Sequence, residues 1–129
     1  MKPSSKSKRV GELQLKILRV LWERGEATVA EVHRALSREK RRAYTTIATM
    51  LRKMEERGLV GHRADGRAFR YAARVQESEV TRGATNDVLQ RLFRGSLTEM
   101  VSHLRAEREV SDAELRELES LIREQRRRK

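Results

Sequence analysis

The sequence contains no cysteine and only one proline among its 129 residues. Without cysteine, disulfide bonds, thiolate catalysis and cysteine-based metal sites are excluded. No stretch approaches the length and apolarity of a transmembrane span, and no apolar signal-peptide region follows the polar N-terminus. We therefore expect a cytoplasmic protein that does not insert into a membrane.

Residues suited to catalysis are also scarce. The three histidines, His33, His62 and His103, lack the spacing of metal ligands, and no glycine-rich phosphate-binding loop occurs. His33 lies off the apolar stripe of its helix and is expected at the surface or facing a phosphate. The sequence predicts no catalytic residue, no metal site and no cofactor, so we expect a protein that is not an enzyme.

Positive charge is concentrated in the first part of the chain. Residues 1–76 carry 19 basic and 8 acidic side chains, whereas residues 77–129 carry 11 of each. A basic part beside a neutral part predicts a polyanion-binding module joined to a region with another purpose. The length allows one small domain with an appendage, or two very small domains.

Residues 43–58 are predicted to form a helix with two unlike faces. Its apolar side chains recur at helical spacing and should point inward; they are Ile47, Met50, Leu51 and Met54. The opposite face is slim, basic and rich in hydroxyl groups, and it carries Tyr44, Thr45, Ala48, Thr49, Arg52 and Lys53. Short side chains let a helix approach base edges, and flanking cations can meet phosphates, as a major-groove recognition helix requires.

Two helices and a charged turn are expected before that helix. The first spans about residues 11–24 and is stopped by Gly25. Thr28 and Glu31 have the spacing of a capping box that starts a second helix. The turn at residues 37–42 contains four cations, which near a phosphate backbone would add affinity without sequence information. A solvated turn without such a role is the alternative.

A β-hairpin is predicted after the recognition helix. Residues 59–64 and 67–72 are strand-like, and Asp65-Gly66 between them is a strong turn signal. Because side chains alternate along a strand, Phe69 and Tyr71 share one face, which we expect to pack on the helices.

Three helices followed by a hairpin with arginines near its tip form a winged helix-turn-helix, whose wing rests beside the DNA groove. Arg63 and Arg67 flank the predicted turn.

Three more helices are predicted in residues 77–129, two of them opened by capping boxes at Ser96 and Ser111. Their apolar residues are too few for a separate core, which predicts a homodimer matching a palindromic operator. Folding back on the winged helix as a monomer is the alternative. The predicted dimerisation residues are Val88, Leu92, Phe93, Leu97, Met100, Val101, Leu104, Leu115, Leu118, Leu121 and Ile122.

The chain resembles the penicillinase-repressor family (BlaI/MecI/CopY) from about Leu13 to Ile122. The resemblance lies in the order and spacing of Leu21-Trp22, Tyr44-Thr45-Thr46-Ile47, Leu51, Gly58-Leu59-Val60, Asp65-Gly66-Arg67 and Tyr71. It implies a mainly α protein with a small β wing, in which an N-terminal winged helix-turn-helix precedes a C-terminal helical dimerisation region. It also implies a dimeric cytoplasmic repressor of an inverted-repeat operator in double-stranded DNA.

This resemblance divides the chain into a flexible basic arm at residues 1–10, a DNA-binding domain at residues 11–76 and a dimerisation region at residues 77–129. By position, the base-reading residues are Thr45, Thr46, Ala48, Thr49 and Arg52. The expected phosphate contacts are Arg41, Arg42, Tyr44, Lys53, Arg63 and the wing arginine Arg67.

Regulation is the part of the family pattern from which the chain departs. A membrane metalloprotease sensor is a candidate partner, and its candidate inactivation site falls at His103-Leu104, where the asparagine-phenylalanine pair of cleaved repressors is absent. The C-terminal cysteines of the copper-responsive branch are absent too. An alternative function is a winged-helix module that coats DNA without sequence choice or docks a protein.

Overall fold

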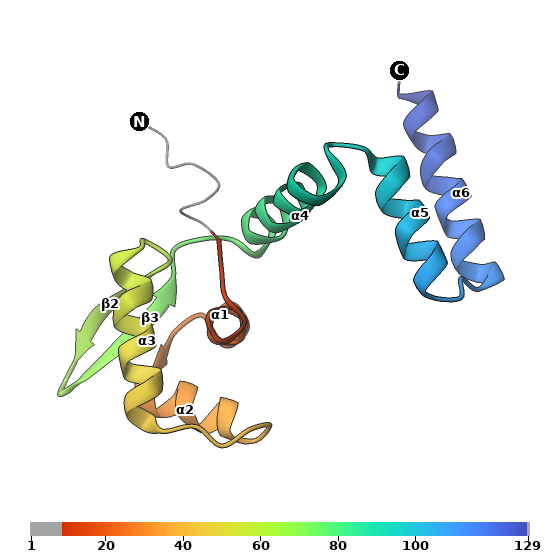
Figure 1. The fold of residues 1–129 in the computed structure, drawn as a ribbon. Helices are drawn as coiled ribbons and strands as arrows, with labels where there is room; N and C mark the ends of the chain where they lie inside the picture. The colour runs from red at the N-terminus through yellow and green to blue at the C-terminus, as the bar shows by residue number, and fades with distance from the viewer. Residues whose placement is uncertain (1–8, 129) are drawn as a thin grey trace. The chain divides into compact units, whose positions relative to one another are not determined.

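The computed structural model describes residues 9–128, so the predicted basic arm lies almost wholly outside the described residues. The chain is mainly helical with one small sheet (Figure 1), as predicted. Its elements are α1 (Glu12–Arg24), β1 (Ala27–Thr28), α2 (Val29–Ser37), α3 (Tyr44–Glu56), β2 (Val60–Asp65), β3 (Ala68–Ala73), α4 (Glu77–Phe93), α5 (Leu97–Glu107) and α6 (Asp112–Arg127).

The chain divides into two compact units, one ending at Asp87 and the other beginning at Val88. The predicted boundary between residues 76 and 77 separates a DNA-binding domain from a dimerisation region, and this division by function stays a prediction. None of the helices formed by residues 9–128 combines the length and the apolar character needed to cross a lipid bilayer.

The predicted capping box at the start of α2 is confirmed. The hydroxyl of Thr28 accepts a hydrogen bond from the Glu31 amide at 3.1 Å, and the Thr28 amide donates to the Glu31 carboxylate at 2.9 Å. The amides at the start of an α-helix have no hydrogen-bond acceptor within the helix, and these two contacts provide one for each amide. At α5 and α6 only one half of this arrangement is present: the hydroxyls of Ser96 and Ser111 accept from the amides of Glu99 and Glu114, each at 3.1 Å.

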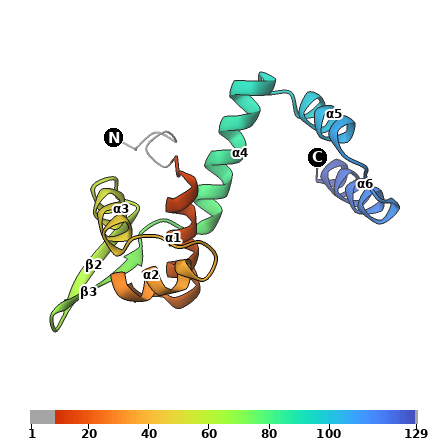
Figure 2. The same cartoon turned by 60° about the horizontal axis from the view of Figure 1, so that its bottom comes forward.

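The sheet is antiparallel in the order β1-β3-β2. Asp65 pairs with Ala68, so the central residues of the hairpin turn are Gly66 and Arg67, one residue later than predicted. Gly66 has a φ of 64°, a positive value that a glycine adopts without steric cost at the first central position of a tight hairpin turn. The turn end of the hairpin extends beyond the helices in both views (Figures 1 and 2), with Arg67 at its tip.

The core of the N-terminal unit is formed by α1, α2, α3 and the sheet. Ile47, Leu51 and Met54 of α3 are completely buried, and α3 contacts α1, α2 and β2. The core also contains Val75 and Val80 from beyond the hairpin. The other buried apolar residues are Ile17, Leu18, Val20, Leu21, Ala27, Val32, Leu36, Leu59, Val60 and Tyr71.

One packing prediction for the hairpin is wrong. Tyr71 is buried as expected, but Phe69, two residues before it on the same face, is 51% exposed. The helices cover only the part of the strands near Tyr71, and the ring of Phe69 contacts His62 with centroids 4.4 Å apart.

The C-terminal unit has little core of its own. Helices α5 and α6 run in opposite directions (Figures 1 and 2), and neither contains a buried residue. Most of the predicted dimerisation residues are exposed; those with at least 41% exposure are Leu92, Leu97, Val101, Leu104, Leu115, Leu118, Leu121 and Ile122. His103 lies near Phe93, with ring centroids 5.8 Å apart.

The two faces of α3 predict opposite effects on stability. Leu51→Ala removes a fully buried side chain and should lower the free energy of unfolding by roughly 2 to 5 kcal/mol, because a cavity remains. Thr49→Ala changes an exposed position of the same helix and should change it by less than about 0.5 kcal/mol. Urea unfolding of both variants measures the contrast, and equal losses would show that α3 is not packed as described.

Candidate nucleic-acid interface

The outer face of α3 carries mainly hydroxyl and cationic side chains. Thr45, Thr46, Thr49 and Arg52 are exposed, and Ala48 between them is partly buried. A shallow hollow on this face is lined by Thr45, Thr46, Thr49, Met50 and Lys53. Threonine hydroxyls both donate and accept hydrogen bonds, and arginine can donate two to one base. The predicted base-reading residues therefore lie together on one accessible helix face.

The turn before α3 is held by His33 and Arg42, two side chains predicted to lie at the surface or to face phosphates. His33 Nε2 lies 2.7 Å from the carbonyl oxygen of Arg42, and its ring meets Tyr44 edge to face at 5.8 Å. Arg42 donates to the carbonyl oxygens of Leu36 at 3.3 Å and Lys40 at 3.2 Å, at the end of α2. Expected at the surface, His33 is partly buried and supports the start of α3.

The other end of α3 is connected to α1 through Gln14. The side-chain nitrogen Nε2 of Gln14 lies 3.4 Å from the sulfur of Met50. The side-chain oxygen Oε1 accepts a hydrogen bond from the Arg57 guanidinium at 2.8 Å and another from the backbone amide of Gly11 at 3.1 Å. Arg57 also donates to the carbonyl oxygen of Arg9. These contacts fix the end of α3 and the entry of the chain into α1.

His62 connects α3 to the wing. Its Nδ1 lies 2.7 Å from a carboxylate oxygen of Glu55 on α3, and its ring lies between Phe69 and Tyr71, with centroid distances of 4.4 and 5.4 Å. Burial raises the pKa of the Tyr71 hydroxyl, with a further contribution from the charge of Glu55. No sequence motif indicated this contact, because the strand register determines which residue faces α3.

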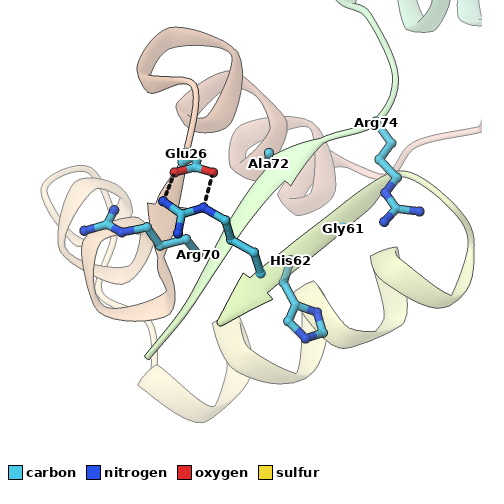
Figure 3. Close-up of a pocket in the computed structure, with 7 residues that line it drawn as sticks. Glu26, Gly61, His62, Arg70, Ala72 and Arg74 are labelled. Atoms are coloured by element: carbon cyan, nitrogen blue, oxygen red, sulfur yellow. Dashed lines mark hydrogen bonds and ion pairs between the residues drawn. The ribbon is translucent and has the colours of Figure 1, made fainter. Parts of the chain in front are cut away.

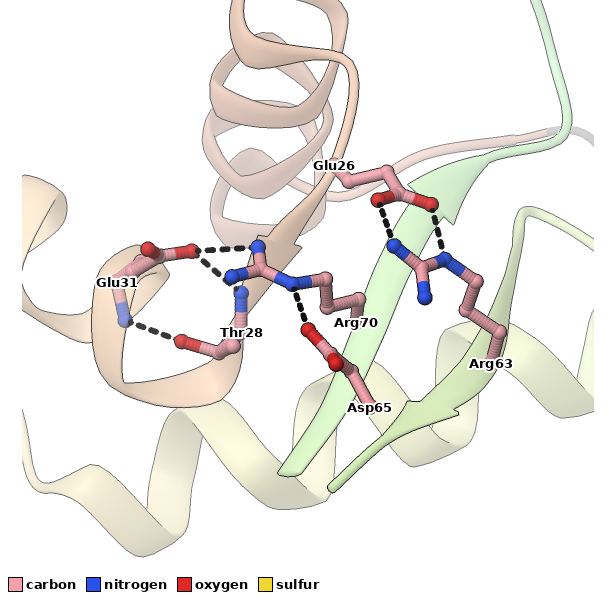
Figure 4. Close-up of polar contacts among 6 residues, drawn as sticks. All are labelled: Glu26, Thr28, Glu31, Arg63, Asp65 and Arg70. Atoms are coloured by element: carbon pink, nitrogen blue, oxygen red, sulfur yellow. Dashed lines mark hydrogen bonds and ion pairs between the residues drawn. The ribbon is translucent and has the colours of Figure 1, made fainter. Parts of the chain in front are cut away.

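The opposite face of the sheet carries a network of ion pairs (Figure 4). Arg63 donates through Nε and a terminal nitrogen to both oxygens of Glu26, each at 2.9 Å. Arg70 donates to Asp65 at 2.7 Å and to Glu31 at 3.4 Å. Because side chains alternate along a strand and His62 faces α3, Arg63 points away from α3.

These contacts shift the carboxylate pKa values downward. Hydrogen bonding by Arg63 lowers the pKa of Glu26, and hydrogen bonding by Arg70 lowers that of Asp65. The pKa of Glu31 is lowered first by the Thr28 amide and then by the charges of Arg70 and Arg24. The three groups are therefore carboxylates at neutral pH.

The same sheet face contains a shallow pocket (Figure 3), lined by Glu26, Gly61, His62, Arg63, Arg70, Ala72 and Arg74. Gly61 and Ala72 are paired across the strands. A Cβ atom at position 61 would overlap the guanidinium of Arg74, so a larger residue there would require this exposed side chain to move. Two of its three arginines, Arg63 and Arg70, are paired with carboxylates.

The predicted phosphate contacts fall into two groups. Arg41, Lys53 and Arg67 are exposed at the start of α3, on α3 and at the wing tip. Arg42, Tyr44 and Arg63 contact other parts of the protein instead. The outer face of α3, together with Arg41 and Arg67, is what we call the candidate interface.

Comparisons with known proteins agree with this architecture. A family model described as Penicillinase repressor matches residues 10–124. The penicillinase repressor of Bacillus licheniformis is 28% identical over 120 residues, which cover 93% of this chain and 94% of that protein. The transcriptional regulator BlaI of Mycobacterium tuberculosis is 38% identical over 86 residues, covering 66% of this chain and 62% of that one.

Among solved structures, the DNA binding domain of the repressor BlaI, determined in solution, superimposes with a TM-score of 0.52 and 28% identity. The match covers 61% of this chain and 93% of that domain.

The Glu26–Arg63 pair predicts a dependence of stability on pH. Because the folded pKa of Glu26 lies below its ordinary value of 4.5, the pair stabilises the protein above pH 4.5, and this contribution is lost as the pH falls through the folded pKa. The melting temperature of Glu26→Gln should therefore fall less steeply than that of the wild type between about pH 6 and pH 3.

Glu23→Gln is the matched control, because Glu23 is exposed and has no ion pair within residues 9–128. It should keep the wild-type pH profile. Identical profiles for both variants and the wild type would contradict a stabilising role for the pair.

Proposed function

Because the chain belongs to the penicillinase-repressor family of DNA-binding transcriptional repressors, we propose that it represses transcription in the cytoplasm as a homodimer on an inverted-repeat operator. The observation that carries the proposal is the outer face of α3, whose threonines and arginine are exposed while Ile47, Leu51 and Met54 on the inner side are fully buried; Met50, predicted to point inward, is only partly buried and borders the outer hollow. A helix of this kind can enter the major groove without loss of its own packing.

In the proposed complex, Thr45, Thr46, Thr49 and Arg52 read base edges. Hydroxyl groups can pair with several bases, whereas arginine pairs best with the two acceptors of guanine. Ala48 has no hydrogen-bonding side chain, so its contribution is limited to apolar contact with a thymine methyl group.

Phosphate contacts would hold α3 in register on the duplex. Arg41, Lys53 and Arg67 support this role best, because they are exposed cations around the candidate interface. Arg42, Tyr44 and Arg63 are weaker candidates, because each has a partner within the protein. For Arg63 to bind a phosphate, it would have to give up both hydrogen bonds to Glu26.

The homodimer is supported by the apolar surface of the C-terminal unit. Leu121 is 63% exposed and Ile122 is 54% exposed, although large apolar side chains are normally covered. A second copy would cover the same surface on both subunits through two-fold symmetry. That symmetry also explains an inverted-repeat operator, in which each α3 reads one half-site.

Control by a sensor metalloprotease is compatible with where the candidate site lies. The bond between His103 and Leu104 is inside α5, a helix without buried residues. Proteolysis of a helix requires local unfolding, and a helix with few buried contacts unfolds at low cost. Cleavage there would remove Leu104 and everything after it from the proposed dimer.

Base contacts and phosphate contacts should respond differently to substitution. Arg52→Ala should weaken binding to the preferred operator by on the order of 1 to 3 kcal/mol and leave binding to a scrambled duplex almost unchanged. Arg67→Ala should weaken both and reduce the slope of log affinity against log salt by about 0.9, the value for one phosphate contact. Fluorescence anisotropy with both duplexes measures the two quantities.

The two variants control for each other, because each removes one arginine. If Arg52→Ala weakened both duplexes alike, Arg52 would not read bases. Equal affinity of the wild type for the operator and the scrambled duplex would favour the alternative of a winged helix that coats DNA without sequence choice.

The dimer predicts a position-specific effect on α6. Leu118→Asp places a charge within the exposed apolar stripe and should convert the dimer to a monomer in sedimentation equilibrium, because a buried unpaired charge is costly. Ser120→Asp adds the same charge on the opposite side of the helix and should leave the dimer intact. A Leu118→Asp protein that remained dimeric would rule out this surface as the interface.

A further inference from the structure

The wing is a small structure that needs support from outside itself. Among residues 9–128, its two strands, Val60–Asp65 and Ala68–Ala73, are joined by one further strand, the short β1, which pairs with β3 through Ala27 and Thr28. A two-stranded hairpin is marginally stable in water, and its turn end extends beyond the helices here (Figures 1 and 2). The direction of Arg67 at the tip therefore depends on contacts that attach the hairpin to the rest of the domain.

Two arginines face each other across the strands on the side away from α3. Arg63 and Arg70 are directly paired in the antiparallel register. Like charges at such a position repel each other. Each arginine is instead paired with carboxylates, and these carboxylates lie in different parts of the domain.

Arg70 joins three segments of the chain (Figure 4). Its Nε donates to Asp65 at 2.7 Å, and Asp65 is the last residue of β2 before the Gly66–Arg67 turn. A terminal nitrogen of the same guanidinium lies 3.4 Å from Glu31. That oxygen of Glu31 also accepts from the Thr28 amide in the capping box of α2.

The geometry points to Arg70 as the positioning residue of the wing. Its guanidinium connects the carboxylate beside the wing tip to the first turn of α2, which leads into α3. Arg70 thereby fixes the direction in which Arg67 projects relative to α3. This inference rests on the proposed function, in which α3 and Arg67 contact the same DNA.

The chemistry of the side chain explains the use of arginine. A guanidinium has several N–H donors in a rigid plane and can bind two carboxylates at once, whereas a lysine ammonium is a point charge on a flexible stem. The side chain of Arg70 is 30% exposed, compared with 57% for Arg63. Arg70 is therefore the more sheltered of the two and the one attached near the tip.

Arg63 provides a matched comparison. It forms a bidentate pair with Glu26 and points to the same side of the sheet. Arg63→Gln removes the same charge as Arg70→Gln but leaves the contacts of Asp65 and Glu31 in place. A general loss of positive charge would weaken DNA binding alike in both variants, whereas a loss of wing position should make the loss in Arg70→Gln the larger of the two.

Asp65→Asn further distinguishes an effect of net charge from an effect of wing position. It raises the net charge by one and weakens the contact with Arg70, because an amide oxygen is a poorer acceptor than a carboxylate. If charge alone mattered, Asp65→Asn would bind DNA more tightly. If Arg70 positions the wing, Asp65→Asn will bind more weakly, although its charge change is opposite to that of Arg70→Gln.

The test is a double-mutant cycle between Arg70→Gln and Arg67→Ala in the full chain. The probe is the duplex that the wild-type protein selects from a random-sequence library, and anisotropy is recorded over a range of salt concentrations. Each single variant should reduce the salt slope by up to about 0.9. The double variant should bind no more weakly than Arg67→Ala, because Arg70 acts through Arg67. Arg70→Lys should restore only part of the lost affinity.

Additive losses in the cycle, tighter binding by Asp65→Asn, or equal losses for Arg63→Gln and Arg70→Gln would overturn the inference. An unchanged slope for Arg67→Ala would also overturn it, because the wing tip would then make no phosphate contact. If Arg70→Gln fails to fold, Asp65→Asn decides by the direction of its effect. A wild type without preference for the selected duplex over a scrambled one would instead overturn the proposed function itself.

Discussion

The complete burial of Ile47, Leu51 and Met54 fixes helix α3, and the rest of the structure depends on that packing. These three side chains attach one side of the helix to α1, α2 and the sheet, so Thr45, Thr49 and Arg52 on the outer side lie outside the core. The outer side can then carry exposed threonines, an arginine and a lysine, which are the residues proposed to contact DNA. In a protein with so small a core, this separation means that substitutions on the candidate interface should not unfold the domain.

The polar contacts around α3 divide the basic residues into two kinds. Some arginines maintain the shape of the domain: Arg42 binds carbonyl groups at the end of α2, and Arg63 and Arg70 are paired with carboxylates. Others, such as Arg52 and Arg67, are exposed on the candidate interface. Net positive charge alone therefore overstates how many cations are available to phosphates, because part of it is already compensated within the wing.

Local sequence patterns predicted the elements well, because capping boxes and helical spacing act over three or four residues. The hairpin was predicted with its turn one residue early, and Phe69 was placed in the core, because the extent to which helices cover the strands is not encoded locally. The pairs of Glu26 with Arg63 and of Glu31 with Arg70 join residues 37 and 39 positions apart, and no motif marks them. The strand register carries one signal for these pairs. A turn at Gly66–Arg67 places Arg63 opposite Arg70, and two facing arginines repel each other unless carboxylates lie nearby.

Site-directed DNA cleavage tests the central claim, that the outer face of α3 enters the major groove, most directly. Because the sequence has no cysteine, a cysteine introduced at Thr46 is the single attachment point for an iron-EDTA reagent, and one at Arg19, on the exposed side of α1, is the control. We expect cleavage confined to the centre of each half-site from position 46 and no localised cleavage from position 19. Dispersed cleavage from position 46, or half-site cleavage from position 19, would contradict it.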